Sequence, residues 1–240
     1  MRNIIECKQS DYRKRRLKDR IWAYHALGMH KEAIYECRKL VRMVPNDADS
    51  FIRLGYQCDE GSQTSKAIRY YRFALKKFPD DAYIYTNLGF CYERYKKRPD
   101  LARVCYEKAL ALDPTHLWAL NNLGTIFQKE GDRDSALRYY KKAWYSAWCD
   151  GGDEEYSVIH NLAWAYFRCK VYRRAWVILC YLVHKCPDSE SIQCDFGVVN
   201  YKIGAYSRAW DMFSKVLSMK PDSKYYRRLY RVAQKKVVTQ

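Results

Sequence analysis

The chain has 240 residues, of which 48% are hydrophobic and 30% are charged, and its formal net charge is +17. These fractions exclude a disordered chain, and the scarcity of glycine (10) and proline (6) favours helices over sheets. No stretch is long, apolar and uncharged enough to cross a bilayer. The positive charge attracts nucleic acid, anionic lipid and acidic proteins alike, so it does not by itself select a partner.

The first residues give little indication of export. From Met1 to Arg16, only Ile4 and Ile5 form an apolar core before a basic run, which is too little for a secretory signal. The ten cysteines include no Cys-x-x-Cys pair, so reduced thiols are expected rather than a disulfide framework. We therefore expect a cytoplasmic protein.

An alanine recurs along the chain, and an aromatic or apolar residue, or a cysteine, stands four positions after it. The alanines are Ala33, Ala67, Ala102, Ala136, Ala175 and Ala209, and the residues that follow them are Cys37, Tyr71, Tyr106, Tyr140, Leu179 and Phe213. Successive alanines are 34, 35, 34, 39 and 34 residues apart. A four-residue spacing places both members of a pair on one face of a helix, and we expect that face to pack against a neighbouring helix.

A second signature precedes the alanine in most units. A large apolar residue is followed there by a small one, which lets a second helix approach closely. The pairs are Leu54-Gly55, Leu88-Gly89, Leu123-Gly124, Leu162-Ala163 and Phe196-Gly197. Most units end at a proline with a short polar residue after it, and such a pair stops one helix and caps the next. Each unit is therefore expected to be a helical hairpin.

At these positions the sequence resembles the tetratricopeptide repeat superfamily, whose pattern of W-x2-L-G-x2-Y, then A-x3-F, then P is matched in register over residues 48–221. The resemblance implies an all-α fold, a right-handed superhelical solenoid of about six hairpins plus a C-terminal capping helix, in one domain over residues 1–240. The repeats are expected at 14–47, 48–81, 82–116, 117–155, 156–189 and 190–223, with the capping helix at 224–237. Helical arrays of the Sel1 or pentatricopeptide type have other periods or lack the Leu-Gly register.

Two segments depart from the pattern. The first unit has Arg20-Ile21 where Leu-Gly is expected, which indicates an end repeat with different packing. Over residues 149–155, an acidic insertion replaces the fourth proline, and a hinge, a partner contact and a tolerated loop are all compatible with it. After Pro221, apolar residues at helical spacing predict a helix that covers the open end of the stack.

In the resembled family, the first helix of each hairpin lines the concave side of the superhelix, so the register implies which residues line a groove. An Asn precedes the Leu of the Leu-Gly pair, or of its Leu-Ala equivalent, in three successive repeats, where the family commonly uses Asn to hydrogen-bond the backbone of an extended peptide. Aromatic residues recur further along the same side. The candidate groove residues are Asn87, Phe90, Trp118, Asn122, Asn161, Trp164, Phe167 and Tyr201.

These groove residues have a second explanation. Each aromatic taken alone is compatible with packing between repeats, and Asn-Leu-Gly is also plain family consensus. As a set, the aromatics favour a groove that binds an apolar anchor of a partner.

One subclass of the family binds the acidic carboxyl terminus of heat-shock chaperones through a clamp of Lys, Asn, Asn, Lys and Arg. Here the position two residues after the Leu is aromatic or Thr in the repeats that carry the Asn, so the clamp is incomplete and this activity is not expected. Lys129, Arg94 and Arg168 near the ends of first helices could still meet an acidic ligand.

The sequence shows no machinery for catalysis. Residues 61–66 lack the second glycine of a phosphate loop, and Cys180, His184 and Cys186 lack a fourth zinc ligand. The motifs of zinc proteases and serine hydrolases do not occur. We therefore expect no enzyme activity, no cofactor and no metal ion.

The sequence favours a cytoplasmic scaffold or adaptor that binds a peptide or helix of a partner protein in its groove, with no membrane insertion. The alternative is a basic RNA- or ribosome-associated helical repeat protein. Residues 1–47 hold 12 Lys and Arg against 6 Asp and Glu, and residues 190–240 hold 10 against 4, but residues 117–156 hold 5 against 7. A continuous basic stripe is thus absent. We expect the basic ends to bind nucleic acid only non-specifically, or to meet an acidic protein.

Overall fold

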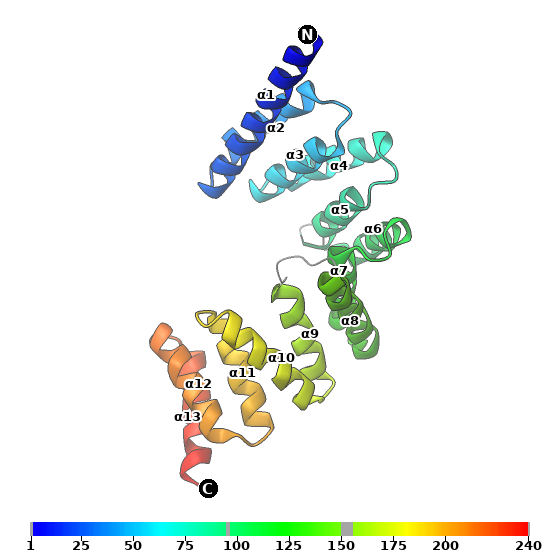
Figure 1. Cartoon of the computed structure of the whole chain (residues 1–240). Coiled ribbons are helices and arrows are strands. Elements are labelled where there is room, and N and C mark those ends of the chain that lie inside the picture. The colour runs from blue at the N-terminus through cyan, green and yellow to red at the C-terminus, as the bar shows by residue number, and fades with distance from the viewer. Residues whose placement is uncertain (1, 95–96, 150–155, 240) are drawn as a thin grey trace. The chain divides into compact units, whose positions relative to one another are not determined.

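The computed structural model describes residues 2–94, 97–149 and 156–239, and these residues form thirteen α-helices and no strand. Each helix runs back along the one before it, so that successive helices pair as hairpins (Figure 1). The predicted all-α fold of helical repeats is therefore confirmed. Most of the acidic segment 149–155 lies outside the described residues.

The chain divides into two compact units, Met1–Ala119 and Leu120–Gln240. The first unit contains α1 (Arg2–Ala26), α2 (His30–Met43), α3 (Ala48–Glu60), α4 (Thr64–Lys77), α5 (Ala82–Arg94), α6 (Pro99–Leu112) and the start of α7 (Leu117–Glu130). The second contains the rest of α7, α8 (Arg133–Cys149), α9 (Tyr156–Arg168), α10 (Tyr172–Lys185), α11 (Glu190–Lys202), α12 (Tyr206–Met219) and α13 (Lys224–Val238). The single domain over residues 1–240 and its repeat bounds stay a prediction.

The two helices of a hairpin meet at a contact that we call the seam, where a small residue of the first helix faces a ring of the second. A Cβ atom built on Gly124 would lie 2.8 Å from the Cε1 atom of Tyr140, and one on Gly197 would lie 2.6 Å from that of Phe213. Gly89 meets Tyr106 in the same way. Because real Cβ atoms do not approach so closely, glycine is required for these helices to pack at this distance.

In the first hairpin the larger seam residue lies on the first helix and the smaller one on the second helix. At its seam the glycine position holds Ile21 and the ring position holds Cys37, and both side chains are buried in the core of the first unit. The fifth hairpin is intermediate, with Ala163 and Leu179 buried in the second unit. The departure seen in the sequence is therefore a compensated exchange of volume between the two helices.

The turn inside each hairpin contains one residue with positive φ at a matching position. Three of these six residues are glycines, among them Gly131 with φ +88°, and three are not: Ser62 at +59°, Lys97 at +49° and Lys170 at +61°. The left-handed conformation ends the first helix and reverses the chain. Of residues 61–66, considered as a phosphate loop, residues 61–63 form such a turn and residues 64–66 begin α4.

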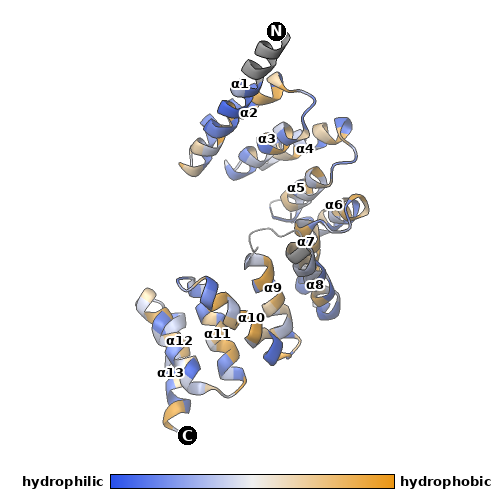
Figure 2. Ribbon diagram, viewed as in Figure 1, coloured by the Kyte–Doolittle hydropathy of each residue, from blue (hydrophilic) through white to orange (hydrophobic). Residues whose placement is uncertain are grey.

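The last helix, α13, packs against α12 as predicted for the segment after Pro221. Ala233 is buried beside Phe213, while Tyr226 and Leu229 pack on the same core. The hydroxyl oxygen of Ser223 caps the helix by accepting a hydrogen bond from the backbone N–H of Tyr226, at 3.3 Å. Hydrophilic residues cover much of α13, whose last two residues, Val237 and Val238, are apolar (Figure 2).

Candidate functional site: the inner stripes of the first helices

Each first helix has one side that the hairpin seam does not use, and we call it the inner stripe. On α5 this stripe comprises Tyr83, Asn87, Phe90 and Arg94, whose spacing of four, three and four residues follows one side of a helix. The neighbouring positions Leu88 and Gly89 are buried at the seam. The equivalent positions on the other first helices define their inner stripes.

In the first unit, three successive inner stripes carry an exposed aromatic residue at the same position. These residues are Trp22 on α1, Tyr56 on α3 and Phe90 on α5, and their exposed fractions are 70%, 41% and 36%. Trp22 was missed in the sequence because the first unit has no Leu-Gly pair to set its register. Trp22 stands as far before Ala33 as Tyr56 stands before Ala67, so counting back from the alanine identifies it.

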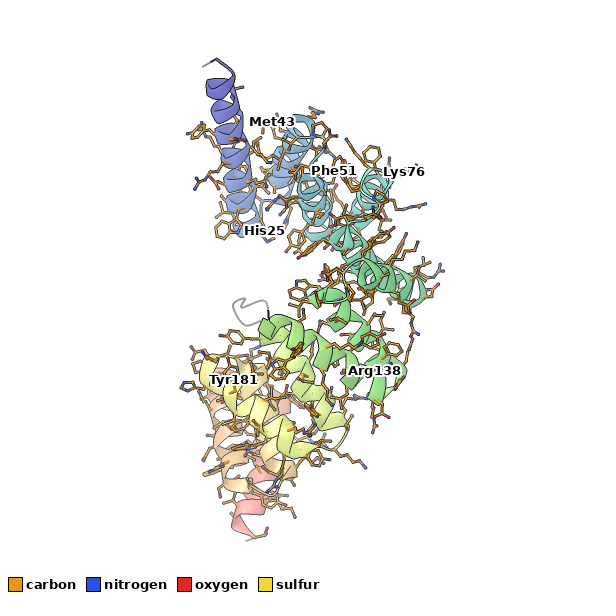
Figure 3. All side chains as sticks on the ribbon, turned by 45° about the vertical axis from the view of Figure 1, so that its right-hand side comes forward. His25, Met43, Phe51, Lys76, Arg138 and Tyr181 are labelled. Atoms are coloured by element: carbon orange, nitrogen blue, oxygen red, sulfur yellow. The ribbon has the colours of Figure 1, made fainter. Side chains whose placement is uncertain are left out.

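Two residues that flank the stripe of α1 contact Asp49 and Tyr56 of the α3 stripe and so place the two stripes side by side. The Lys18 ammonium lies 2.6 Å from the Oδ2 atom of Asp49, and the ring of His25 lies 5.4 Å from that of Tyr56 (Figure 3, where His25 is labelled). Burial alone would raise the pKa of Asp49, but hydrogen bonds from Arg53 and Lys18 hold it below its usual range. Asp49 is therefore a charged, paired group at neutral pH.

Two of the three predicted residues in the first unit, Asn87 and Phe90, contact other residues of α5. The Asn87 side-chain amide donates to the Tyr83 carbonyl oxygen at 2.8 Å, and the Arg94 guanidinium lies 5.5 Å from the Phe90 ring centre. Trp118 is exposed at the start of α7. These three predicted residues, Asn87, Phe90 and Trp118, belong to one unit and the other five belong to the second.

His116 joins the stripe of α5 to the start of α7 and was not predicted. Its buried ring lies edge-on to Tyr83, with ring centres 4.5 Å apart, and its Nδ1 atom accepts a hydrogen bond from the backbone N–H of Ala119. Burial lowers the pKa of His116, although the carboxylate of Asp113 opposes this. The neutral ring therefore caps α7 at physiological pH.

In the second unit, two residues of the α9 stripe, Asn161 and Trp164, each contact a neighbouring side chain. The Asn161 amide donates to the Oδ1 atom of Asn121 at 3.0 Å, and the rings of Trp164 and Phe167 lie 4.7 Å apart. Trp164 and Phe167 are both half-buried. Phe167 also packs against the core and lies 5.5 Å from Tyr172, so part of its surface serves folding.

The remaining predicted residues of the second unit are less closely associated. Asn122 is half-buried on α7, and the residue that meets Asn161 is its neighbour Asn121. Tyr201 of α11 packs on the last core and lies edge-on to Tyr206 at 5.1 Å. Neither Asn121 nor the contact between His160 and Asp195 was predicted from the sequence.

An imidazole–carboxylate contact links α9 to α11. The Nε2 atom of His160 lies 2.8 Å from the Oδ2 atom of Asp195, and both side chains are mostly buried. Asp195 occupies the position that holds Asn87, Asn122 and Asn161 in the preceding repeats. This pair fixes the stripes of the two helices against each other, as Lys18 and Asp49 do in the first unit.

Potential metal ligands and thiols are dispersed over the described residues. No group of three potential metal ligands occurs among them, and Cys180 and His184 are both exposed on α10. Burial raises the pKa of the Cys37 and Cys194 thiols to about 12, so neither supplies a thiolate nucleophile near neutral pH. The eight cysteines whose side chains the structure describes are free thiols. Among the described helices, none has the length and apolar character that are needed to span a membrane.

Comparisons with known proteins agree with this architecture. The tetratricopeptide repeat family model matches residues 80–143. The BBSome complex member bbs-4 of Caenorhabditis elegans is 33% identical over 111 residues, which cover 45% of this chain and 24% of that protein. The uncharacterized protein ycf37 of Guillardia theta is 30% identical over 125 residues, covering 50% of this chain and 68% of that one.

Solved structures of low sequence identity share the fold. PilF of Pseudomonas aeruginosa superposes with a TM-score of 0.75 at 17% identity, over 95% of this chain and 99% of that one. The repeat register and the family model matched over residues 80–143 identify the chain as a member of the tetratricopeptide repeat superfamily, and PilF shows that it shares the fold.

Proposed function

We propose that this chain is a non-enzymatic, cytoplasmic scaffold or adaptor whose inner stripes bind a peptide or helix of a partner protein. A tetratricopeptide repeat fold supports a role in protein–protein interaction, and the similar worm protein is described as a member of a complex. The observation that carries the proposal is the row of Trp22, Tyr56 and Phe90, exposed at one position of three successive first helices.

The exposed aromatic rings of the inner stripes are suited to anchoring a partner. Large aromatics anchor interfaces because they bury much area and lose little conformational entropy. Truncation of a central one typically costs about 2 kcal/mol or more of binding free energy. The stripes also hold side-chain amides: Asn87 and Asn161 each donate one hydrogen bond within the chain. Among the described residues nothing donates to their Oδ1 atoms, which leaves these atoms for a peptide N–H.

The test is partner capture by alanine variants of the inner stripes. Trp22→Ala, Trp164→Ala and Asn122→Ala proteins are immobilised, and the bound proteins are identified by mass spectrometry after nuclease treatment. We expect each Trp variant to bind its partners about thirtyfold more weakly, which corresponds to a loss of about 2 kcal/mol of binding free energy. Tyr35→Ala is the matched control, because Tyr35 is an exposed aromatic on a second helix, away from the inner stripes.

Thermal melting separates binding from folding in the same variants. If Trp164 were a packing residue between repeats, its truncation would cost roughly 3–5 kcal/mol of stability. Capture lost with melting nearly unchanged supports the proposal. Unchanged capture in all three variants, or a collapse of melting in the Trp variants, rejects it.

A basic RNA- or ribosome-associated role is the second candidate, and α13 favours it. A shallow depression of about 340 Å³ on this helix is lined by five cationic side chains and one valine. The cations are Lys224, Arg227, Arg228, Arg231 and Lys235. The same capture, repeated without nuclease and over a salt series, separates the candidates, since contacts with phosphate weaken steeply as salt rises. Retention that depends on intact RNA would favour the second candidate.

A further inference from the structure

A second surface of the first unit is hollowed on a side of α3 that the inner stripe does not use. A cleft of about 550 Å³ lies between the second helices α2 and α4, and we call it the α2–α4 cleft. Phe51 and Leu54 of α3 line it from below, whereas Arg53 and Tyr56 of the inner stripe do not (Figure 3, where Phe51 is labelled). It is thus a separate surface from the one proposed above.

The floor of the cleft is apolar and one of its walls carries an exposed ring. Phe51 and Leu54 are buried, and Val41 of α2 is half-buried beside them. Phe73 of α4 has 56% of its surface exposed although its ring lies only 5.8 Å from that of Phe51. An apolar side chain seated here would cover Phe73 and remove its surface from water, which is favourable.

The rim of the cleft is positively charged on both sides. Arg38 projects from α2, and Lys66 and Arg69 lie one turn apart on α4. No Asp or Glu lines the cleft. Lys66 donates a hydrogen bond to the Gln63 side chain, and within the described residues Arg38 and Arg69 make no salt bridge. Three cations around an apolar floor attract an anion that also carries an apolar group.

We propose that the α2–α4 cleft binds an acidic peptide segment in which a large apolar side chain is flanked by carboxylates. The apolar side chain lies over Phe51 and Phe73, and the carboxylates pair with Arg38 and Arg69, whose guanidinium groups suit bidentate pairing. The cations come from two helices on opposite sides of an open cleft. A peptide with several carboxylates reaches both sides at once, whereas a single lipid headgroup does not.

The repeat does not impose this arrangement, because the last pair of hairpins lacks it. The positions equivalent to Arg38 and Arg69 hold Cys180 and Asp211 there, and only the equivalent of Lys66, Arg208, keeps its charge. The equivalent of Phe73 is Lys215, which donates a hydrogen bond to the Pro187 carbonyl. The second unit thus offers a matched site for control substitutions.

The experiment measures binding of fluorescein-labelled peptides to the full chain by fluorescence anisotropy. The probe is EDEFEDLD, and its partner EDESEDSD keeps the charges but lacks the apolar side chains. We expect Arg69→Glu to weaken binding of the first peptide at least tenfold and Phe73→Ala at least threefold. The control Arg208→Glu, with the same change of charge on an exposed second-helix position, should change affinity less than twofold. Circular dichroism verifies that each variant is folded.

Several outcomes would overturn the proposal. They are equal binding of the two peptides, an equal effect of Arg69→Glu and Arg208→Glu, and no binding of EDEFEDLD at millimolar concentration. Binding of the chain to vesicles of phosphatidylserine and phosphatidylcholine that Arg69→Glu abolishes, in the absence of peptide binding, would assign the cleft to a membrane surface instead. The inner-stripe variant Trp22→Ala should leave the peptide affinity unchanged, so failure here is distinguishable from failure of the proposed function.

Discussion

The hairpin seams and the inner stripes are built from the same first helices, yet they differ in how strictly they repeat. At the seams the summed size is kept: Gly124 meets a tyrosine ring, while the larger Ile21 shares its seam with the small Cys37. On the inner stripes the residue types change from helix to helix, as from Phe90 to Thr125. The seams therefore obey a packing rule, and the stripes do not.

The difference shows which residues the fold constrains. A seam residue has one partner within its own hairpin, and any change in volume must be matched across a contact of a few ångström. A residue on an inner stripe is partly exposed and its size is free to vary. The stripes vary while the summed size at the seams stays constant. Selection for a particular partner would therefore act on residues of the stripes. Three sets of substitutions test how strict the seams and turns are.

The largest effect is expected at the seam of the fourth hairpin. A leucine at position 124 would place its first carbon within 2.8 Å of the Tyr140 ring, so α7 and α8 would be forced apart. We expect Gly124→Leu to cost about 3 kcal/mol or more and to lower the melting temperature by roughly 10 °C. Asn122→Leu, which introduces the same leucine side chain on the same helix but off the seam, should stay within about 0.5 kcal/mol. An unchanged Gly124→Leu melting curve would contradict the seam.

A smaller effect tests the exchange of volume in the first hairpin. Cys37→Tyr alone should destabilise the chain by about 1–3 kcal/mol, because Ile21 occupies the space that the ring needs. The double variant Cys37→Tyr with Ile21→Gly restores the size pattern of the other hairpins. Denaturant unfolding should therefore show that the second change recovers at least half of the loss. Strictly additive costs would mean that Ile21 and Cys37 do not share a seam.

The smallest effect concerns the turns. Lys170 adopts φ +61°, a region that costs a side chain with a Cβ atom about 1 kcal/mol relative to glycine. Lys170→Gly should raise the melting temperature by about 3 °C. The reverse change at the matching turn, Gly204→Lys, should lower it by a similar amount, since Gly204 has φ +86°. Shifts of the same sign in both variants would show that the positive φ does not govern the stability of these turns.

The sequence predicts the seams well because their partners lie close along the chain. Gly124 and Tyr140 are sixteen residues apart, so the register and the hairpin geometry suffice. The stripes are harder, because Asn121–Asn161 and His160–Asp195 join residues 40 and 35 apart. Those contacts depend on how far one hairpin rotates on the next, which the register does not specify. The α2–α4 cleft was not predicted, since residues of three helices form it.

The register also shows what Arg231 of α13 does. It stands 34 residues after Gly197, at the position where a glycine would admit a second helix, and its side chain is exposed. A guanidinium there excludes by bulk and charge a helix that would seat on α13 as α12 seats on α11. A further helix could pack on α13 in this register only if the Arg231 side chain first moved aside.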